Sequence, residues 1–342
     1  MQVSRSFKTE DQYIVTHRVE QTGVRLDAFL KDRYRKRSRE NHKRSIGSGA
    51  IAIQRNQSPH LMIGRLKPST LLIAGDEVLV VSDRKPEPPV CFDYRILYED
   101  DVLFVIDKPA NLPVHPAGRY FFNTLLAHLR TERRPNAAGD LVVADHDFFL
   151  AHRIDKETSG ILVLTKDSAA CADLTRQFAD RATEKRYYAI VHGVPPQEQF
   201  EVALAMRRST VSRVELKMAV APEEGGGQNA LTTFKRVGTH GKFALLECSP
   251  KTGRQHQIRV HLEAAGFPIV GDKLYGLDED EAYRFFERQF ISAEAEAKLM
   301  LPRHALHACW IRFTHPVTRL KMEFHCELPP DLRGFLDRQT VL

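Results

Sequence analysis

The sequence predicts a mixed α+β protein with two domains. The chain has 342 residues, which exceeds one average domain and favours two. Stretches typical of strands and helices follow one another without the regular alternation of a doubly wound sheet. The proline-rich stretch SDRKPEPPVCFD separates a basic N-terminal part from a nearly neutral remainder. We therefore expect domains at 1–85 and 94–342, joined by an extended linker at 86–93.

Composition places the chain among ordinary globular proteins. Apolar residues make up 42% and charged residues 27%, which allows a sizeable core. No apolar run approaches the ~20 residues of a membrane-spanning helix, and the N-terminus does not have the pattern of a signal peptide. The five cysteines lie far apart without a CxxC pair. This is typical of a reduced protein with buried thiols and no zinc site, so we expect a cytoplasmic protein.

The N-terminal part has the pattern of a small α+β module. GVRLDAFLKDRY predicts an amphipathic helix with Leu26, Phe29 and Leu30 on one face. GSGAIAIQRN follows as a turn that leads into a strand. PSTLLIAGDEVLVV contains a tight AGD turn between two short apolar strands.

The basic excess of the chain lies in this module. Residues 1–90 carry 17 Lys and Arg against 10 Asp and Glu, whereas the other 252 residues carry 33 against 34. A solvated helix face is the more common explanation of a charge run, and a polyanion-binding surface is the alternative. The candidate contacts are Lys31, Arg33, Arg35, Lys36, Arg37, Arg39, Lys43 and Arg44.

The second part alternates irregularly between strand and helix patterns. The predicted strands are DDVLFVID, Phe148–Ile154, GILVLTKD, KRYYAIVHG, ALTTFKRVG, KFALLECSP, HALHACWIRFTHP and RLKMEFHCEL. SAACADLTRQFADRAT predicts a helix capped by Ser168. KTGRQHQIRVHLEAAG predicts a helix from about Gly253, with Thr252 and Gln255 at capping-box spacing and a stop at Gly266. AYRFFERQFISAEAEAKLML predicts a further helical region. No Walker A or GxGxxG pattern is present, so nucleotide binding of those types has no support.

Asp155 is the first candidate for chemistry. It lies in AHRIDKETSGILVLTKD, between a predicted strand and a turn. The flanking Arg153 and Lys156 favour its ionised form, in which a carboxylate can act as a nucleophile, a base or a metal ligand. An aspartate that opens a turn is more often a turn residue only.

Two further stretches carry polar residues of interest. In TGRQHQIRVHL, Arg254 or Arg259 could bind a carboxylate or a phosphate, or the helix could simply be basic and exposed. His256 and His261 are five residues apart and do not match the HExxH zinc pattern. Tyr187 and Tyr188 point to opposite faces of a strand. One could line a cleft and stack on a base, or both could be structural.

Taken in order, HRIDKETSGILVLTKD, KRYYAIVHG, TGRQHQIRVHL and GFPIVGDKLYG resemble the four motifs of the RluA-type pseudouridine synthases. The resemblance covers about residues 94–328 and implies the mixed, mostly antiparallel sheet of that fold. The N-terminal part resembles an αL RNA-binding domain of the S-four type through VRLDAFL, the pair Ser38–Arg39 and AGDEVLV. The stretch GSGAIAIQRNQSPHLMIGRLKPST is longer than the usual ending of that domain.

The resemblance implies a role for each candidate. Asp155 would be the nucleophile, Arg259 its partner, and Tyr187 the residue that stacks on the target base. Arg153 would fill the space left by a flipped nucleotide, and His152 and Arg254 would join the RNA contacts. Residues 158–160 would shape the turn that presents Asp155. Asp272 and Tyr275 would have either a structural or a site role.

The activity implied is isomerisation of uridine to pseudouridine in structured RNA, without cofactor or metal. Large-subunit ribosomal RNA is the expected target and transfer RNA the alternative. A non-catalytic RNA-binding protein and a hydrolase that uses Asp155 are the rival functions. The motifs do not distinguish attack on the ribose from addition to the uracil ring. The sequence does not define the oligomeric state, and a monomer is expected.

Overall fold

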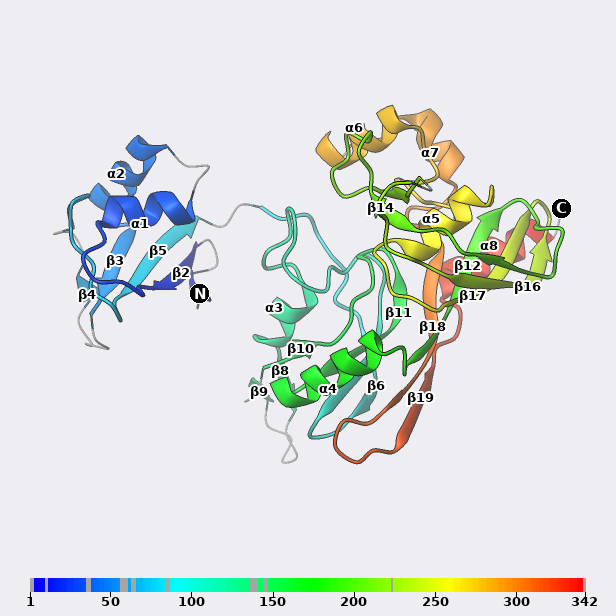
Figure 1. Ribbon diagram of the computed structural model, residues 1–342, viewed down its shortest axis with the longest axis horizontal. Helices are drawn as coiled ribbons and strands as arrows, with labels where there is room; N and C mark the ends of the chain where they lie inside the picture. The colour runs from blue at the N-terminus through cyan, green and yellow to red at the C-terminus, as the bar shows by residue number, and fades with distance from the viewer. Residues whose placement is uncertain are drawn as a thin grey trace. The chain divides into compact units, whose positions relative to one another are not determined.

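The computed structural model describes residues 3–9, 12–34, 38–55, 61–62, 66–83, 86–135, 141–143, 147–222, 224–288 and 290–340. The chain divides into two compact units, Met1–Pro86 and Glu87–Leu342. The elements of each unit are shown in Figure 1.

The first unit contains an antiparallel sheet with the strand order β1-β2-β5-β3-β4. Its elements are β1 (Val3–Thr9), β2 (Gln12–Arg18), α1 (Leu26–Arg33), α2 (Arg39–Gly47), β3 (Ile51–Gln54), β4 (Leu61–Met62) and β5 (Glu77–Asp83). The predicted apolar face of α1 is confirmed, since Leu26, Phe29 and Leu30 are buried in one cluster with strand residues. Ser38 caps α2, because its side chain accepts a hydrogen bond from the Asn41 amide at 3.2 Å.

The basic segment of the first unit is only partly a free charged surface. The side chains of Lys31, Lys43 and Arg44 are exposed. Arg33 lies instead against the Phe29 ring, 3.5 Å from its centroid, and is only 13% exposed. Three predicted contacts, Arg35, Lys36 and Arg37, lie outside the described residues, and so does the side chain of Arg39.

The second unit is built on a ten-stranded sheet with the main order β13-β16-β17-β12-β18-β11-β7-β6. β10 pairs with β11, and β19 pairs with β18. Only the β11–β18 pair is parallel among the described strands, so the predicted mixed, mostly antiparallel sheet is confirmed.

The strands of this sheet are β6 (Arg95–Glu99), β7 (Leu103–Lys108), β10 (Phe149–Leu150), β11 (Ser159–Thr165), β12 (Glu184–His192), β13 (Gln199–Val202), β16 (Thr232–His240), β17 (Phe243–Pro250), β18 (Leu306–Thr314) and β19 (Lys321–His325). Two small hairpin sheets are formed by β8 (Arg133–Pro135) with β9 (Leu141–Val143) and by β14 (Met206–Arg208) with β15 (Met218–Val220). The helices are α3 (Leu125–Leu129), α4 (Ser168–Ala179), α5 (Gln257–Ala264), α6 (Glu279–Arg288), α7 (Ala293–Leu299) and α8 (Pro330–Thr340).

Strand β11 is buried along its whole length, which explains its unbroken apolar sequence. Leu162 and Leu164 face a cluster that includes residues of α3. Ile161 and Val163 face a second cluster that includes a residue of α4. Where β11 begins, Gly160 has φ +106°, and a Cβ atom there would lie 2.2 Å from the Ala308 carbonyl oxygen. Only glycine therefore permits the close approach of β11 to β18.

The predicted strand over Phe148–Ile154 is wrong beyond its first residues. β10 ends at Leu150, and Asp155 lies in the loop between β10 and β11. β10 ends early because a side chain takes the place of its backbone: Nε2 of His152 accepts the Val163 amide hydrogen at 3.0 Å. This hydrogen bond takes the donor that the next rung of the β10–β11 ladder would have used.

The predicted helix starts also need correction. α5 begins at Gln257, and Thr252 does not cap it but donates from its hydroxyl to Oε1 of Gln257 at 2.6 Å. The side chain of Asp167 caps α4 in place of Ser168, because it accepts the Ala170 amide hydrogen at 2.8 Å. The helical region predicted over AYRFFERQFISAEAEAKLML forms two helices, α6 and α7.

The proline-rich stretch packs on the second unit. The Glu87 carboxylate accepts hydrogen bonds from the amides of residues 121–123, at 2.8–3.0 Å. Val90 and Phe92 pack against the cluster around Phe104. Residues 87–93 are thus held by contacts with that unit, although the sequence predicts a linker there. Within the described part of the chain, no helix is both long and apolar enough to cross a membrane.

Candidate active site

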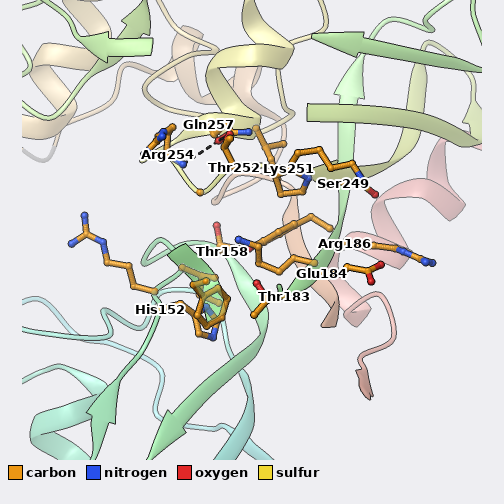
Figure 2. Close-up of a pocket in the computed structure, with 18 of the residues that line it drawn as sticks. His152, Thr158, Thr183, Glu184, Arg186, Ser249, Lys251, Thr252, Arg254 and Gln257 are labelled. Carbon is orange, nitrogen blue, oxygen red and sulfur yellow. Dashed lines mark hydrogen bonds between the residues drawn. The ribbon is translucent and has the colours of Figure 1, made fainter. Parts of the chain in front are cut away.

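A cleft of about 880 Å³ opens in the second unit. Its walls are the loop that carries Asp155, the start of β12, the end of β17 and the segment that leads into α5. Figure 2 shows Lys251, Thr252 and Arg254 on one side of this cleft and His152 and Thr183 on the other. All three predicted catalytic residues, Asp155, Tyr187 and Arg259, line it.

Arg259 joins two carboxylates at the base of the cleft. Its Nη1 donates to Oδ2 of Asp155 at 2.9 Å. Its Nε and Nη2 donate to the two oxygens of Asp272 at 2.7 and 2.9 Å. Asp272 is fully buried and also accepts the amide hydrogens of Leu274 and Tyr275. A bidentate pair of this kind holds the planar guanidinium in one orientation, so Asp272 aims Arg259 at Asp155.

The charges around Asp155 keep it ionised. Burial favours the neutral acid, but protonated His256, the charge of Arg259 and the hydrogen bond from Arg259 together lower the pKa of Asp155 to about 2. Near pH 7, where His256 is neutral, Arg259 is the contacting cation that keeps Asp155 ionised. Burial likewise opposes ionisation of Asp272, and Arg259 outweighs it and holds the pKa of that carboxyl well below its usual range. Because one guanidinium serves both carboxylates, the trio has a net charge of −1 at neutral pH.

One oxygen of Asp155 is left for a substrate. Oδ2 is engaged by Arg259, whereas Oδ1 has no hydrogen bond from the described residues. Nε2 of His256 lies 4.0 Å from Oδ1. The side chain of Asp155 is 32% exposed and lines the cleft.

His256 is a site residue that was not identified from the sequence. It immediately precedes α5 with a left-handed backbone, φ 58°, which is uncommon for a non-glycine residue. Its Nδ1 lies 2.8 Å from the hydroxyl of Tyr275, which also accepts the Met218 amide hydrogen at 3.0 Å. Burial lowers the pKa of His256 to about 4, so the ring is neutral near pH 7. His256 lies within TGRQHQIRVHL, but the sequence assigned it no role there, and its approach to Asp155 joins segments about 100 residues apart.

Tyr187 and Tyr188 occupy different environments on β12. Tyr187 lines the cleft and packs against two core clusters, whereas Tyr188 does not line it. Burial and the nearby Asp155 raise the pKa of Tyr187. Its hydroxyl is therefore protonated at neutral pH, and its ring is available as an apolar surface.

The other predicted site residues lie around the cleft in different roles. Arg153 is exposed, with Nη1 3.3 Å from Nε2 of His115. Arg254 donates from Nε to the Asn229 carbonyl at 3.2 Å. Burial lowers the pKa of His152 to about 3, and its Nε2 is used within the fold, so its ring carries no charge toward a phosphate.

Four further cations line the cleft and were not selected from the sequence. They are Arg181, Lys185, Arg186 and Lys251. Burial lowers the pKa of Lys185, and among the described residues it has no ion pair. Arg186 lies 4.3 Å from the centroid of the Trp310 ring. Glu184 and Glu247 line the same wall, and Arg186 is paired with Glu247 at 3.8 Å. The cations still outnumber the carboxylates there, which suits a polyanion.

Buried polar residues hold the Asp155 loop from behind. The Thr158 amide donates to the Asp155 carbonyl at 3.1 Å, and the Thr158 hydroxyl bonds Nε2 of His304 at 2.8 Å. The ammonium of Lys108, at the end of β7, donates to three carbonyls, including that of Lys156 at 3.1 Å. Burial lowers the pKa of Lys108 to about 7. The sequence placed residues 158–160 in this supporting turn, but it did not predict the part of Lys108, because a buried lysine cannot be told from an exposed one in a sequence.

Comparison with known proteins gives one family. Residues 102–264 match the model of the RNA pseudouridylate synthases. The large-subunit pseudouridine synthase D of Zymomonas mobilis is 33% identical over 323 residues, 93% of this chain and 95% of that one. The large-subunit pseudouridine synthase C of Vibrio cholerae is 30% identical over 92% of this chain and 93% of its own length.

A transfer-RNA enzyme and a solved structure are also similar. The mitochondrial tRNA pseudouridine(32) synthase of Saccharomyces cerevisiae is 33% identical over 254 residues, 74% of this chain and 50% of that one. The human RNA pseudouridylate synthase domain containing 4 is 27% identical with a TM-score of 0.52, covering 71% of this chain and 92% of that one.

Proposed function

The chain belongs to the RluA-type RNA pseudouridine synthases, and we propose that it acts on large-subunit ribosomal RNA with Asp155 as the nucleophile. The activity that defines the family is the isomerisation of uridine to pseudouridine in RNA. The ribosomal target is supported by relatives that align over nearly the whole chain and are named as large-subunit enzymes. The nucleophile is supported by one observation above all, the 2.9 Å contact between Arg259 and Asp155.

The reaction sets clear requirements for the site. The bond between N1 of uracil and C1′ of ribose breaks, the base turns, and C5 bonds to C1′. C5 then loses a proton and N1 gains one, so atoms and charge balance without a redox step. A carboxylate can attack C1′, remove a proton from C2′ or add to the ring. Each route needs an ionised group with an accessible oxygen, and Oδ1 of Asp155 meets that requirement.

Tyr187 is assigned to the base. Its ring lines the cleft beside the Asp155 loop, and aromatic rings stack on any nucleobase because every base has a π-face. Its protonated hydroxyl has no hydrogen bond from the described residues. It can therefore donate to the base or take part in moving the proton from C5.

Arg153 is assigned to the opened RNA helix. A uridine in a stem must leave the stack before its ribose can reach Asp155, which costs a few kcal/mol. Arg153 is exposed two residues from Asp155 and has no carboxylate partner among the described residues. A planar guanidinium can occupy the space that the base leaves and can neutralise phosphates.

Phosphate contacts supply the remaining affinity. Lys185, Arg186, Lys251 and Arg254 line the cleft of the second unit, and the first unit has exposed cations of its own at Lys31, Lys43 and Arg44. We assign this unit as an αL-type RNA-binding domain. Such contacts do not depend on base sequence and weaken with salt.

Transfer RNA is the second candidate target, favoured by the similarity to the yeast mitochondrial enzyme. Mapping pseudouridine across total RNA from a strain without this gene tests both candidates. Loss of a site in large-subunit ribosomal RNA supports the proposal, whereas loss only in transfer RNA contradicts it. Complementation with Asp155→Asn tests the nucleophile, because restored modification by that variant would exclude Asp155 from this role.

A further inference from the structure

The hydrogen-bond network determines which nitrogen of His256 carries the proton. Tyr275 is almost completely buried, and its hydroxyl oxygen accepts the Met218 amide hydrogen. Within the described part of the chain, Nδ1 of His256 is the sole acceptor within reach of the hydroxyl proton. Because a buried hydroxyl rarely leaves its proton unbonded, Tyr275 donates to Nδ1. The proton of the neutral imidazole therefore lies on Nε2.

This proton faces the free oxygen of the proposed nucleophile. Nε2 of His256 and Oδ1 of Asp155 are 4.0 Å apart, which is too long for a hydrogen bond. A donor and an acceptor are thus held facing each other, and both line the cleft. The left-handed backbone of His256 costs free energy, and such conformations cluster at functional sites, although Asn111, Met300 and Arg319 adopt it outside the cleft.

The reaction creates a charge that a donor at this point can stabilise. When the bond between C1′ and N1 breaks, its electron pair stays on uracil. The negative charge then spreads over N1 and the two carbonyl oxygens. A fixed donor in a partly dehydrated site stabilises such an anion more than it stabilises the neutral base. A neutral imidazole can do this without giving up its proton.

We propose that His256 is a catalytic residue that donates a hydrogen bond from Nε2 to a carbonyl oxygen of uracil while the base is detached from the ribose. Tyr275 is the positioning residue that holds the required tautomer. His256 keeps its proton throughout, so the proton that leaves C5 and the one that reaches N1 balance as before. The inference rests on the proposed role of Asp155 at the ribose.

The test compares two substrates that differ in the stability of the detached base. Fluorine at C5 withdraws electrons, so a 5-fluorouracil anion needs less stabilisation than a uracil anion. The substrates are transcripts of the RNA that lacks pseudouridine in the deletion strain, made with uridine or with 5-fluorouridine. With uridine the product is pseudouridine. With 5-fluorouridine C5 has no proton to lose, so the product followed is the carbon-linked nucleoside that keeps fluorine on C5 and gains one water across the C6–N1 double bond. Both are measured in single turnovers by chromatography and mass spectrometry of digested RNA.

The informative variant is His256→Asn, since asparagine tolerates the left-handed backbone but its side chain is shorter. We expect a loss of about 100-fold with uridine and at most about 10-fold with 5-fluorouridine. Tyr275→Phe should show the same contrast with smaller losses, and it serves if His256→Asn does not fold. Asp272→Asn, which loosens Arg259, should slow both substrates equally.

Equal losses on the two substrates in the His256 and Tyr275 variants would overturn the inference. That result would mean that the ring only positions Asp155 or contacts the ribose. Unchanged activity in His256→Asn would overturn it as well. Asp155→Asn in the same assay separates the two proposals, because an active Asp155→Asn enzyme contradicts the nucleophile assignment whatever the histidine variants show.

Discussion

Asp272 accepts two hydrogen bonds from Arg259, at 2.7 and 2.9 Å, and this buried pair leaves Nη1 of Arg259 to donate to Asp155. Asp272, which does not line the cleft, therefore orients Arg259, which does. Asp272 comes from GFPIVGDKLYG, for which the sequence left a structural and a site role open. The geometry indicates that it positions the site.

The first prediction separates the charge of Arg259 from its orientation. In Arg259→Gln, burial acts on Asp155 without the guanidinium, so its pKa rises from about 2. The acid limb of the single-turnover pH profile should then move to higher pH. The rate at its optimum pH should also fall by about 100-fold or more. Asp272→Asn should lower the rate without moving that limb upward. An unchanged limb in Arg259→Gln, in a variant shown to be folded by thermal unfolding, would contradict this account.

The second prediction concerns the contact between β11 and β18. Gly160→Ala places a methyl group against the Ala308 carbonyl and forces alanine into a positive φ, so the free energy of unfolding should fall by roughly 2–4 kcal/mol. Urea denaturation measures this change. Gly226→Ala is the matched control, because Gly226 has φ +60° but no atom within 4 Å of the position that an added methyl group would take. A similar loss in both variants would show that the steric contact is unimportant.

The third prediction concerns RNA affinity. Lys251→Ala removes an exposed cation from the cleft wall. Binding should weaken, and the slope of log K against log salt should become shallower by about 0.7–0.9 if one phosphate contact is lost. Lys321→Ala removes an exposed lysine of β19 that does not line the cleft, and it should leave the slope unchanged. Identical slopes for Lys251→Ala and the unmodified enzyme would exclude this phosphate contact.

The fourth prediction concerns stability against pH. Burial lowers the pKa of His304 to about 4, whereas an unfolded histidine titrates near 6.5. Between these values the unfolded state binds more protons, so stability is full above about pH 6.5 and decreases as the pH falls toward 4. Urea denaturation should show lower stability at pH 5 than at pH 7. The difference should be smaller in His304→Gln, whose amide can still bond Thr158, and an equal difference would show that His304 is not responsible.

Much of the fold was readable from local patterns. The apolar run GILVLTKD predicts a strand, and β11 is buried on both faces as such a run requires. The face of Leu26, Phe29 and Leu30 on α1 also follows from periodicity. The errors lie where a side chain replaces a backbone partner. His152 ends β10 early, and Gln257 binds residues of the loop before α5 where the predicted first turn would have been.

The sequence by itself predicted most of the central strands, the family, and Asp155, Tyr187 and Arg259 as candidate site residues, because these depend on short patterns and on motifs in order. Only the tertiary structure decided which oxygen of Asp155 is free, which carboxylate orients Arg259, and that His256 faces the cleft. These features depend on contacts between segments as much as 104 residues apart. Hydrogen-bond direction and burial at such contacts are set by how the strands and loops meet, which no local pattern records.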